Sequence, residues 1–353
     1  MAGAPIPVVL TGIGGGGHGE QILKALRLGS RRYRIVGTDS DAICANAGLV
    51  DEFHQLPRAN QPSYLDAVLH LARQASAVAI FHGSEPEMMA LGRDRETIAA
   101  AGFYLPINPL RVLETCRDKA QTAAFLADAG FPAPRTREIE AIGDLDGFDL
   151  LPAILKPSIG GGSANVFIAQ TAAELRAFAT YLLTVVPRLV AQEYIGSPDA
   201  EFTVGLLYGK DGAFLNSIGV KRIISNALSL RSTAPNRTGR AELGERLVVS
   251  SGVSQGIVGR WPDVTRQCEA IGKALAPTAP INIQCRVVGG RVVPFEINPR
   301  FSGTTSLRAM AGYNEPDILI RRDVLGETIE PRFPYREMII MRGLVEQVCA
   351  SGD

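Results

Sequence analysis

The 353-residue sequence predicts an α/β unit at the N-terminus followed by an α+β region. Short apolar strand patterns alternate with helical patterns in the first part, and strand patterns dominate the remainder. Alternation of strand and helix is typical of a parallel sheet covered by helices. Hydrophobic residues make up 46% of the chain, which suits two or three domains or subdomains.

The N-terminal unit is expected to span residues 1–110. Pro106 and Pro109 interrupt the periodic pattern and mark its end. The expected elements are strands at Pro7–Leu10, Tyr33–Gly37 and Ala77–Phe81, and helices at Gly19–Leu28 and Tyr64–Gln74. Their order predicts a parallel sheet with helices on its faces.

Residues 111–195 are expected to form a small α+β subdomain, and residues 196–353 a larger strand-rich one. The smaller is predicted to hold strands at Pro152–Lys156, Ala164–Ala169 and Leu189–Gln192, and helices at Arg117–Ala129 and Ala172–Leu183. The larger is predicted to hold strands at Glu201–Tyr208, Ala213–Val220, Ile281–Val288 and Arg291–Ile297, and helices at Thr265–Leu275 and Ser306–Leu325.

Composition narrows the class of protein. The 36 basic and 36 acidic residues balance, so net charge gives no reason to expect nucleic acid or a membrane surface as partner. The 5 cysteines form no C-x-x-C pair, which favours a reducing cytoplasm over a disulfide framework or zinc site. No apolar run approaches the roughly 20 residues that span a bilayer. A soluble, cytoplasmic protein is therefore expected.

A glycine-rich segment, Gly12 to Gly19, lies between the first strand and the first helix. Asp39 ends the next strand, at the spacing of a dinucleotide-binding fingerprint. Glycine lets a backbone approach phosphate, but the same turn also lets a helix pack closely on a sheet. Both interpretations stay open, and His18 is expected to be solvated or hydrogen-bonded within the turn.

A second glycine-rich segment follows the predicted strand that ends in Lys156. Gly160, Gly161, Gly162 and Ser163 come next, and another strand follows them. A lysine supplies a point charge and a glycine loop supplies N–H donors that can close over a γ-phosphate. The alternative is a mobile glycine hairpin beside a solvated lysine.

The segment Glu193, Tyr194 and Ile195 follows a third apolar strand. Backbone groups at the end of such a strand can pair with an adenine edge, and the Glu201 carboxylate can accept hydrogen bonds from ribose hydroxyls. Taken alone, this segment is also compatible with a solvated surface.

The third cluster is a predicted hairpin around Gly289 and Gly290. A two-residue turn would place Gln284 opposite Phe295, whereas a three-residue loop, Gly289 to Arg291, would pair Gln284 with Glu296. Glycine tolerates positive φ, so the three-residue loop is expected. Gln284, Glu296 and Asn298 would then share one face and offer the hard oxygen ligands that Mg²⁺ accepts.

Together these segments resemble the ATP-grasp superfamily, within it the carbamoyl-phosphate-synthase-like and biotin-carboxylase-like branch. The resemblance runs through nearly the whole chain, in the order Asp118-Lys119, Gly130-Phe131-Pro132-Ala133-Pro134, Leu155-Lys156-Pro157, Asn282-Ile283-Gln284 and Glu296 to Thr305. It implies an ATP-grasp fold preceded by a Rossmann-like parallel-sheet domain.

The resemblance also implies roles for particular residues. Lys119 and Lys156 would be the nucleotide lysines, and Gly160 to Ser163 the phosphate loop. The hinge at Glu193 and Ile195 would meet adenine, and Glu201 the ribose. Gln284, Glu296 and Asn298 would hold Mg²⁺, for which Mn²⁺ could substitute. Arg300 would contact the γ-phosphate or the acyl phosphate.

The implied activity is an ADP-forming ligase that activates a carboxylate as an acyl phosphate and joins it to an amine. No histidine lies between Ser217 and Ala234, where some bicarbonate-using relatives carry one. Lys221, Arg222 and Arg231 lie there instead and could pair with a substrate carboxylate, or form a solvated strand face. The sequence does not encode the oligomeric state, although homodimers are the commonest assembly.

Three other functions stay open. One is phosphorylation of bicarbonate or carbamate, as in carbamoyl phosphate synthase. Another is a nicotinamide-dependent oxidoreductase that uses Gly12 to Gly19 and Asp39. The last is a nucleotide-binding protein that has lost catalysis.

Overall fold

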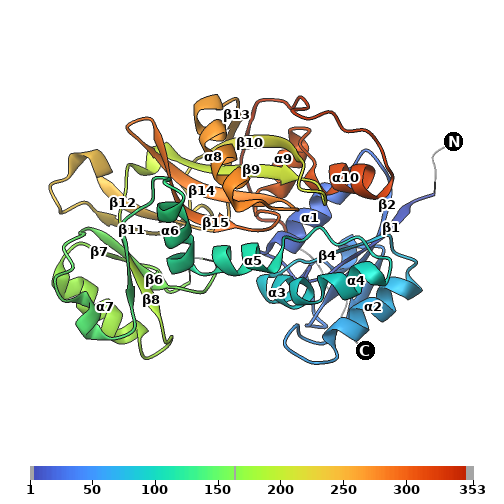
Figure 1. The fold of residues 1–353 in the computed structure, drawn as a ribbon, viewed down its shortest axis with the longest axis horizontal. Helices are drawn as coiled ribbons and strands as arrows, with labels where there is room; N and C mark the ends of the chain where they lie inside the picture. Colours follow the sequence, from blue (N-terminus) through green and yellow to red (C-terminus); the bar gives the residue numbers. More distant parts are fainter. Residues whose placement is uncertain (1–3, 163, 347–353) are drawn as a thin grey trace.

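The computed structural model describes residues 4–162 and 164–346. Figure 1 shows the N-terminal unit (blue) at one end of an elongated molecule and the green and yellow sheets at the other. The red helices near the C-terminus return to the blue unit, so helices from the first and last parts of the described chain pack together.

The N-terminal unit is built on a four-stranded parallel sheet with the strand order β3-β2-β1-β4. Its strands are β1 (Ile6–Leu10), β2 (Tyr33–Asp39), β3 (Glu52–Gln55) and β4 (Ala79–Phe81). Its helices are α1 (His18–Arg27), α2 (Tyr64–Gln74), α3 (Glu85–Arg93) and α4 (Arg95–Ala100). The predicted parallel sheet is confirmed. The sequence missed β3, a short, partly exposed edge strand that lacks a strong apolar pattern.

The middle of the chain forms a second four-stranded sheet, in the order β5-β8-β6-β7, with all its pairs antiparallel. Its strands are β5 (Thr136–Ile139), β6 (Ala153–Pro157), β7 (Phe167–Ala169) and β8 (Leu189–Glu193). The helices nearby in sequence are α5 (Leu110–Arg117), α6 (Lys119–Asp128) and α7 (Ala172–Leu182). Helix α7 packs on β6 and β7 and closes a core of its own. This sheet carries Lys156 and the hinge.

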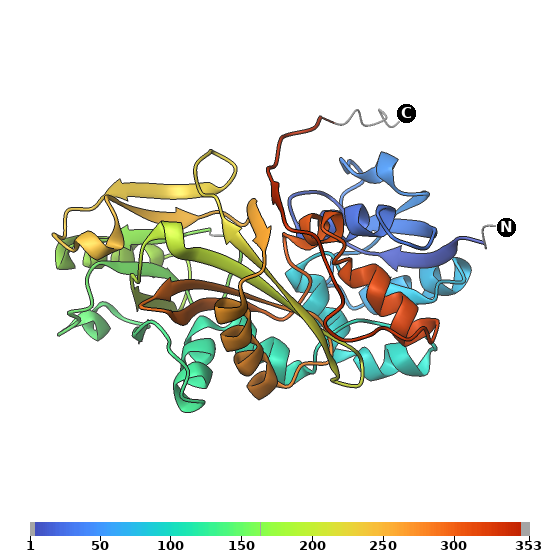
Figure 2. The ribbon, with the colours of Figure 1, turned by 90° about the horizontal axis from the view of Figure 1, so that it is seen from above.

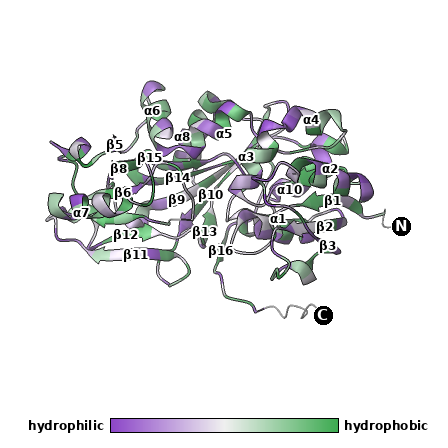
Figure 3. Ribbon diagram, turned by 90° about the horizontal axis from the view of Figure 1, so that it is seen from below, coloured by the Kyte–Doolittle hydropathy of each residue, from purple (hydrophilic) through white to green (hydrophobic). Residues whose placement is uncertain are grey.

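The third part contains a six-stranded sheet in the order β15-β14-β9-β10-β13-β16 and a two-stranded sheet of β11 and β12. The six strands are β9 (Glu201–Tyr208), β10 (Phe214–Arg222), β13 (Gly256–Gly259), β14 (Ile281–Val288), β15 (Arg291–Asn298) and β16 (Met338–Ile340). The other two are β11 (Leu230–Pro235) and β12 (Arg246–Ser250), and helix α8 (Pro262–Leu275) packs on the large sheet. Figure 3 shows hydrophobic residues concentrated along the strands, as expected for sheets buried on at least one face.

The β14–β15 hairpin pairs Gln284 with Glu296 as predicted, but a β-bulge and not the loop length sets this register. Gln284 lies opposite Glu296, as expected. The loop, however, has two residues, Gly289 and Gly290, with φ of 55° and 76°, so the predicted three-residue loop is wrong. The extra residue sits instead in a β-bulge beside Pro294, whose missing N–H weakens the ladder there.

The predicted helix at Ser306–Leu325 is also wrong in its continuity. The segment forms α9 (Thr305–Met310), α10 (Glu315–Leu319) and a π-helical turn, η5 (Ile320–Val324). Gly312 adopts a φ of 93°, and the Asn314 side chain accepts a hydrogen bond from the Asp317 N–H to cap α10. A glycine followed by a capping residue therefore ends one helix and begins another.

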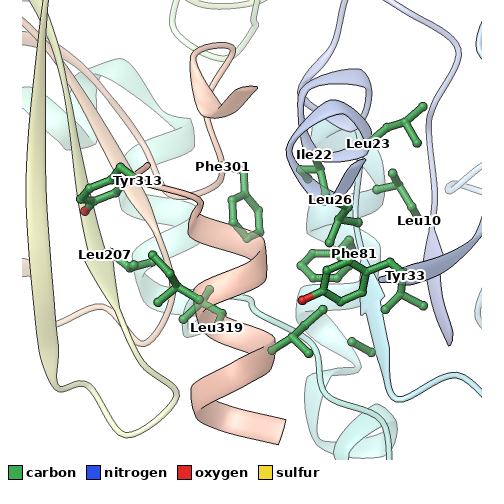
Figure 4. Close-up of a cluster of buried hydrophobic side chains, with 14 of the residues drawn as sticks. Leu10, Ile22, Leu23, Leu26, Tyr33, Phe81, Leu207, Phe301, Tyr313 and Leu319 are labelled. Atoms are coloured by element: carbon green, nitrogen blue, oxygen red, sulfur yellow. The ribbon is translucent and has the colours of Figure 1, made fainter. Parts of the chain in front are cut away.

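One hydrophobic cluster crosses the seam between the N-terminal unit and the third part. Figure 4 shows Phe81 and Leu26, from the first unit, facing Phe301 and Leu319, from the end of the chain. The rings of Phe81 and Phe301 have centroids 5.8 Å apart, and helix α1 packs against both α9 and α10. The cluster fixes the position of the loop after β15 against the parallel sheet.

Within the part of the chain that the structure describes, no helix is both long enough and apolar enough to cross a membrane.

Candidate active site

A cavity of about 100 Å³ lies between the middle sheet and the large sheet. Its walls include ten of the residues singled out from the sequence, namely Lys119, Lys156, Gly160, Gly161, Glu193, Tyr194, Ile195, Glu201, Gln284 and Glu296. A smaller cavity adjoins it, because Lys119, Gly160 and Glu296 line both, and Asn298 lines the second. Segments far apart in sequence thus meet at one place.

The two lysine segments are joined through backbone and side-chain contacts. Asp118 begins α6, and its carboxylate caps the helix and accepts a hydrogen bond of 2.6 Å from Ser158 Oγ. Burial opposes ionisation of Asp118, yet its hydrogen bonds from Ser158 and the α6 backbone and the charge of Arg188 hold its pKa below the usual value. Lys119 N–H donates to the Ser158 carbonyl, so Lys119 stays beside the strand that carries Lys156.

Lys156 is buried in the cavity wall, where its ammonium donates to Gln192 Oε1 at 3.0 Å. Burial, and then the charge of Lys119, lowers the pKa of Lys156 from its usual value to about 7, against the opposing effect of Glu296. No carboxylate lies within ion-pair distance of Lys156 among the described residues. Its charge is therefore available to a phosphate.

The glycine loop after β6 lies over the cavity. Lys119 Nζ donates to the Gly160 carbonyl at 2.7 Å. A Cβ atom added at Gly161 would lie 3.0 Å from a carboxylate oxygen of Glu85, which belongs to the N-terminal unit. Gly162 has a φ of 67°, which favours glycine. Ser163 lies outside the described residues.

The hinge has one backbone donor that no other described group uses. Glu193 N–H donates to the Arg135 carbonyl, and Tyr194 N–H to the Pro152 carbonyl. The carbonyl of Ile195 accepts from Arg286, whereas none of the hydrogen bonds among the described residues takes up the Ile195 N–H. This N–H remains as a candidate donor to an adenine ring.

Glu201 lines the cavity, but its carboxylate is already paired with two buried arginines, Arg222 and Arg286. Its side chain is 1% exposed and accepts from Arg222 Nη1 at 3.0 Å, Ser250 Oγ at 2.6 Å and Arg286 Nε at 3.1 Å. A ribose role for Glu201 would need at least one of these bonds to be shared, and it stays a prediction.

The three basic residues considered as substrate contacts do not gather. Arg222 is buried and paired with Glu201, whereas Lys221 points to the opposite face of β10. Arg231 lies exposed on β11. Arg222 therefore pairs with Glu201, a carboxylate of this chain, and not with a free carboxylate. The three basic side chains form no common site.

The oxygen-rich face of the β14–β15 hairpin fits a hard cation such as Mg²⁺. Gln284 Nε2 donates to Glu296 Oε2 at 3.1 Å, and Asn298 lies on the same face. Glu296 provides the one carboxylate of this trio, and the described residues contain no group of three or more His, Cys, Asp or Glu side chains placed to hold a metal ion. A metal here would therefore draw its remaining ligands from phosphate oxygens and water.

Arg300 joins this face to the N-terminal unit. Its guanidinium donates to Asn298 Oδ1 and to Glu85 Oε1, both at 3.0 Å. Burial opposes ionisation of Glu85, but the charges of Arg300, Lys119 and Arg117 hold its pKa below the usual value. Sequence reasoning missed Glu85, because a glutamate in the first turn of a helix usually serves only that helix.

The segment from Gly12 to Gly19 is held by hydrogen bonds to other residues of the N-terminal unit. Asp39 accepts a hydrogen bond of 2.7 Å from Gly14 N–H, so this carboxylate fastens the loop. His18 is buried, with its Nε2 3.2 Å from His82 Nδ1, so a solvated His18 is wrong. Burial, then Arg300, lowers the pKa of both histidines, and both are neutral near pH 7.

Comparison with known proteins agrees with this fold. Residues 246–343, which include the β14–β15 hairpin and Arg300, match the family model described as "ATP-grasp in the biosynthetic pathway with Ter operon". An uncharacterized protein of Sinorhizobium fredii, y4rH, is 26% identical over 214 residues, a match that spans 57% of this chain and 40% of that protein. The matched part is less than half of that relative.

Solved structures share the fold at low identity. N5-carboxyaminoimidazole ribonucleotide synthetase from Thermus thermophilus matches with a TM-score of 0.63 and 19% identity, over 94% of this chain and 81% of that one. An L-amino acid ligase from Bacillus licheniformis matches with a TM-score of 0.61 and 17% identity, over 94% and 78%.

The biotin carboxylase domain of a Hydrogenobacter thermophilus 2-oxoglutarate carboxylase matches with a TM-score of 0.60 and 15% identity, over 94% and 71%. These likenesses show that the chain has an ATP-grasp fold, and its residues 246–343 match an ATP-grasp family model.

Proposed function

We propose that this protein is an ATP- and Mg²⁺-dependent ligase that activates a carboxylate as an acyl phosphate and joins it to an amine. The observation that carries the proposal is the convergence of Lys119, Lys156, the glycine loop and the Gln284–Glu296 pair on one cavity. Lysines with a closing loop and an oxygen-lined metal face are the parts that phosphoryl transfer needs.

In this proposal the nucleotide lies along the cavity. The Ile195 N–H would meet adenine, and Lys119 and Lys156 would meet the phosphates. A cavity of about 100 Å³ is smaller than the roughly 300 Å³ of small-molecule sites. The loop at Gly160, Gly161 and Gly162 would therefore move outward to admit ATP and return over it. Lys119 would exchange its bond with the Gly160 carbonyl for one with phosphate.

Gln284, Glu296 and Asn298 would hold Mg²⁺, which Mn²⁺ could replace. Bound there, the metal would neutralise charge on the phosphates during transfer. The remaining charge stabilisation comes from the chain itself, because Lys156 is buried without a carboxylate partner and Arg300 adjoins Asn298.

The proposed reaction has two steps. A carboxylate oxygen of the substrate attacks the γ-phosphorus, and the bond to the β,γ-bridging oxygen breaks to release ADP. The amine then attacks the acyl carbon of the mixed anhydride, phosphate leaves, and the amine proton passes to solvent or to a neighbouring base. The closed glycine loop would exclude water, which would otherwise hydrolyse the anhydride.

A substrate screen tests the proposal. Purified protein would be given MgATP with pairs of carboxylic acids and amines, and ADP and amide would be measured. Formation of both, dependent on Mg²⁺ and on both substrates, is the expected result. Failure of MgADP to raise the melting temperature would overturn the proposal. Phosphate release stimulated by bicarbonate alone would replace it with the carbamoyl-phosphate-synthase-like alternative.

A further inference from the structure

A second cavity, of about 370 Å³, lies at the seam between the N-terminal unit and the large sheet. It opens beside the carboxyl ends of β1 and β2, where open parallel sheets commonly bind ligands. One wall is formed by the glycine-rich loop after β1 and by α1, which contributes Glu20 and Lys24. The other wall is formed by the third part of the chain, which contributes Leu228, Gly252, Val253, Gly303 and Arg342. Neither the nucleotide lysines nor the metal face line it.

The charge on these walls favours an anion. Lys24 and Arg342 are the cations, and Glu20 is the one carboxylate among the lining residues. Glu20 is already paired with Lys24 at 2.5 Å and accepts from Gly16 N–H. Two cations against one carboxylate leave the walls with one positive charge in excess.

Arg342 is held in place by the seam. Its Nε donates to the Ser254 carbonyl at 2.9 Å, and its Nη2 donates to Gln21 Oε1 at 2.8 Å and to the Gly303 carbonyl. Figure 2 shows the dark red C-terminal segment running between the two halves of the molecule. All of its hydrogen-bond acceptors are neutral, and the Glu20 carboxylate, which is paired with Lys24, is the acidic group whose charge acts on Arg342.

Part of the remaining lining is apolar, beside the amide side chains of Gln21 and Asn46. Leu228 and Val253 belong to loops of the third part, while Leu344 and Val345, each 78% exposed, follow Arg342 along the chain. A cavity of this size is near the lower end of the range for small-molecule sites. It therefore suits a small molecule with one anionic group and one aliphatic group.

The cavity is connected to the proposed reaction centre by one loop. Gly303 forms part of its wall, and Arg300 lies three residues earlier in the same loop after β15. Arg300 in turn binds Asn298 on the metal face. The loop after β15 therefore contributes residues to both sites.

Resting on the ligase function proposed above, we propose that this cavity binds the amine substrate, and that the amine is an α-amino acid with an aliphatic side chain. Its carboxylate would lie against Arg342 and Lys24, and its side chain against Leu228 and Val253. Its amino group would point toward the loop of Arg300, where the acyl phosphate forms.

Filling the cavity tests this proposal. A Cβ atom at Gly252 would meet no atom within 4 Å, so the leucine side chain of Gly252→Leu would fill part of the cavity without a clash at Cβ. Gly143, in a turn of the middle subdomain, is equally open and gives the matched control Gly143→Leu. We expect Gly252→Leu to raise the KM for the amino acid about tenfold or more while the KM for ATP stays unchanged. The control should alter neither constant.

A second comparison tests the charge. The wild-type protein should prefer leucine to leucinamide, and Arg342→Lys should keep this preference while Arg342→Gln loses it. Equal amino acid KM values for Gly252→Leu and Gly143→Leu would overturn the cavity assignment and leave the ligase function standing. Absence of MgADP binding in the wild-type protein would instead remove the ligase function itself.

Discussion

Lys156 is buried in the proposed site and has no carboxylate partner within ion-pair distance among the described residues. Replacing it with methionine keeps the length of the side chain and removes the charge. Loss of one preorganised charge costs about 2.7–4 kcal/mol in the transition state, so ADP formation should fall by about two to three orders of magnitude. Lys273→Met, on the exposed face of α8, is the control and should retain full activity.

The same lysine predicts a proton linkage. Its pKa is lowered to about 7 in the free protein, so it is largely neutral above pH 7 and protonated below. A bound triphosphate favours the charged form, so ATP binding at pH 8 should take up a proton, and binding at pH 6 should not. Calorimetric titrations in buffers of different ionisation enthalpy measure this uptake, and Lys156→Met should abolish it. Equal uptake in both proteins would contradict the assignment to Lys156.

Glu201 gives a prediction about stability. Glu201→Gln leaves Arg222 and Arg286 buried without their shared carboxylate. Breaking a buried ion pair from one side typically costs about 3–5 kcal/mol, so the free energy of unfolding should fall by that order. Chemical denaturation measures it. A variant with unchanged stability and a raised KM for ATP would show that Glu201 serves ribose more than the network.

At the scale of elements, the glycine loop and α3 approach each other closely enough to interact. Gly161→Val would bring its side chain against the Glu85 carboxylate and hinder closure of the loop. We expect a KM for ATP raised by about tenfold and a larger share of ATP hydrolysed without amide formation, since water would enter. In a double-mutant cycle, valine should cost less in the Glu85→Ala background. Additive effects would show that the contact is not the cause.

The β14–β15 hairpin shows what sequence patterns miss. Alternation and the glycine pair predicted the hairpin and the shared face of Gln284 and Glu296, and the structure has both. The extra residue was assigned to the loop because glycine favours positive φ there. Pro294 was the better signal, since a residue without an N–H disrupts a ladder and allows a bulge.

Other elements were missed because their partners are remote. Strands β11 and β16 are partly exposed, so neither alternation nor burial marks them. The contact between Glu85 and Arg300 joins residues 215 positions apart, and no local pattern encodes it. The segments that line the cavity between the middle and large sheets could be predicted because each consists of contiguous residues whose order along the chain is itself informative.

At the scale of the whole molecule, the cluster at the seam predicts joint unfolding. Leu319 is fully buried there, and Leu319→Ala should lower stability by about 2–5 kcal/mol. Because residues of both halves share the cluster, the N-terminal unit and the third part should still melt in a single transition. Calorimetry and hydrogen exchange of α1 and β10 measure this. Two well-separated transitions in the wild-type protein would contradict it.

The return of the chain's last helices to its first sheet also has a consequence for synthesis on the ribosome. Helix α1 cannot cover its apolar side until α9 and α10 have been made, nearly three hundred residues later. Nascent protein would meanwhile expose Ile22 and Leu26 to chaperones, and a fragment ending near residue 110 would share that exposure and tend to aggregate.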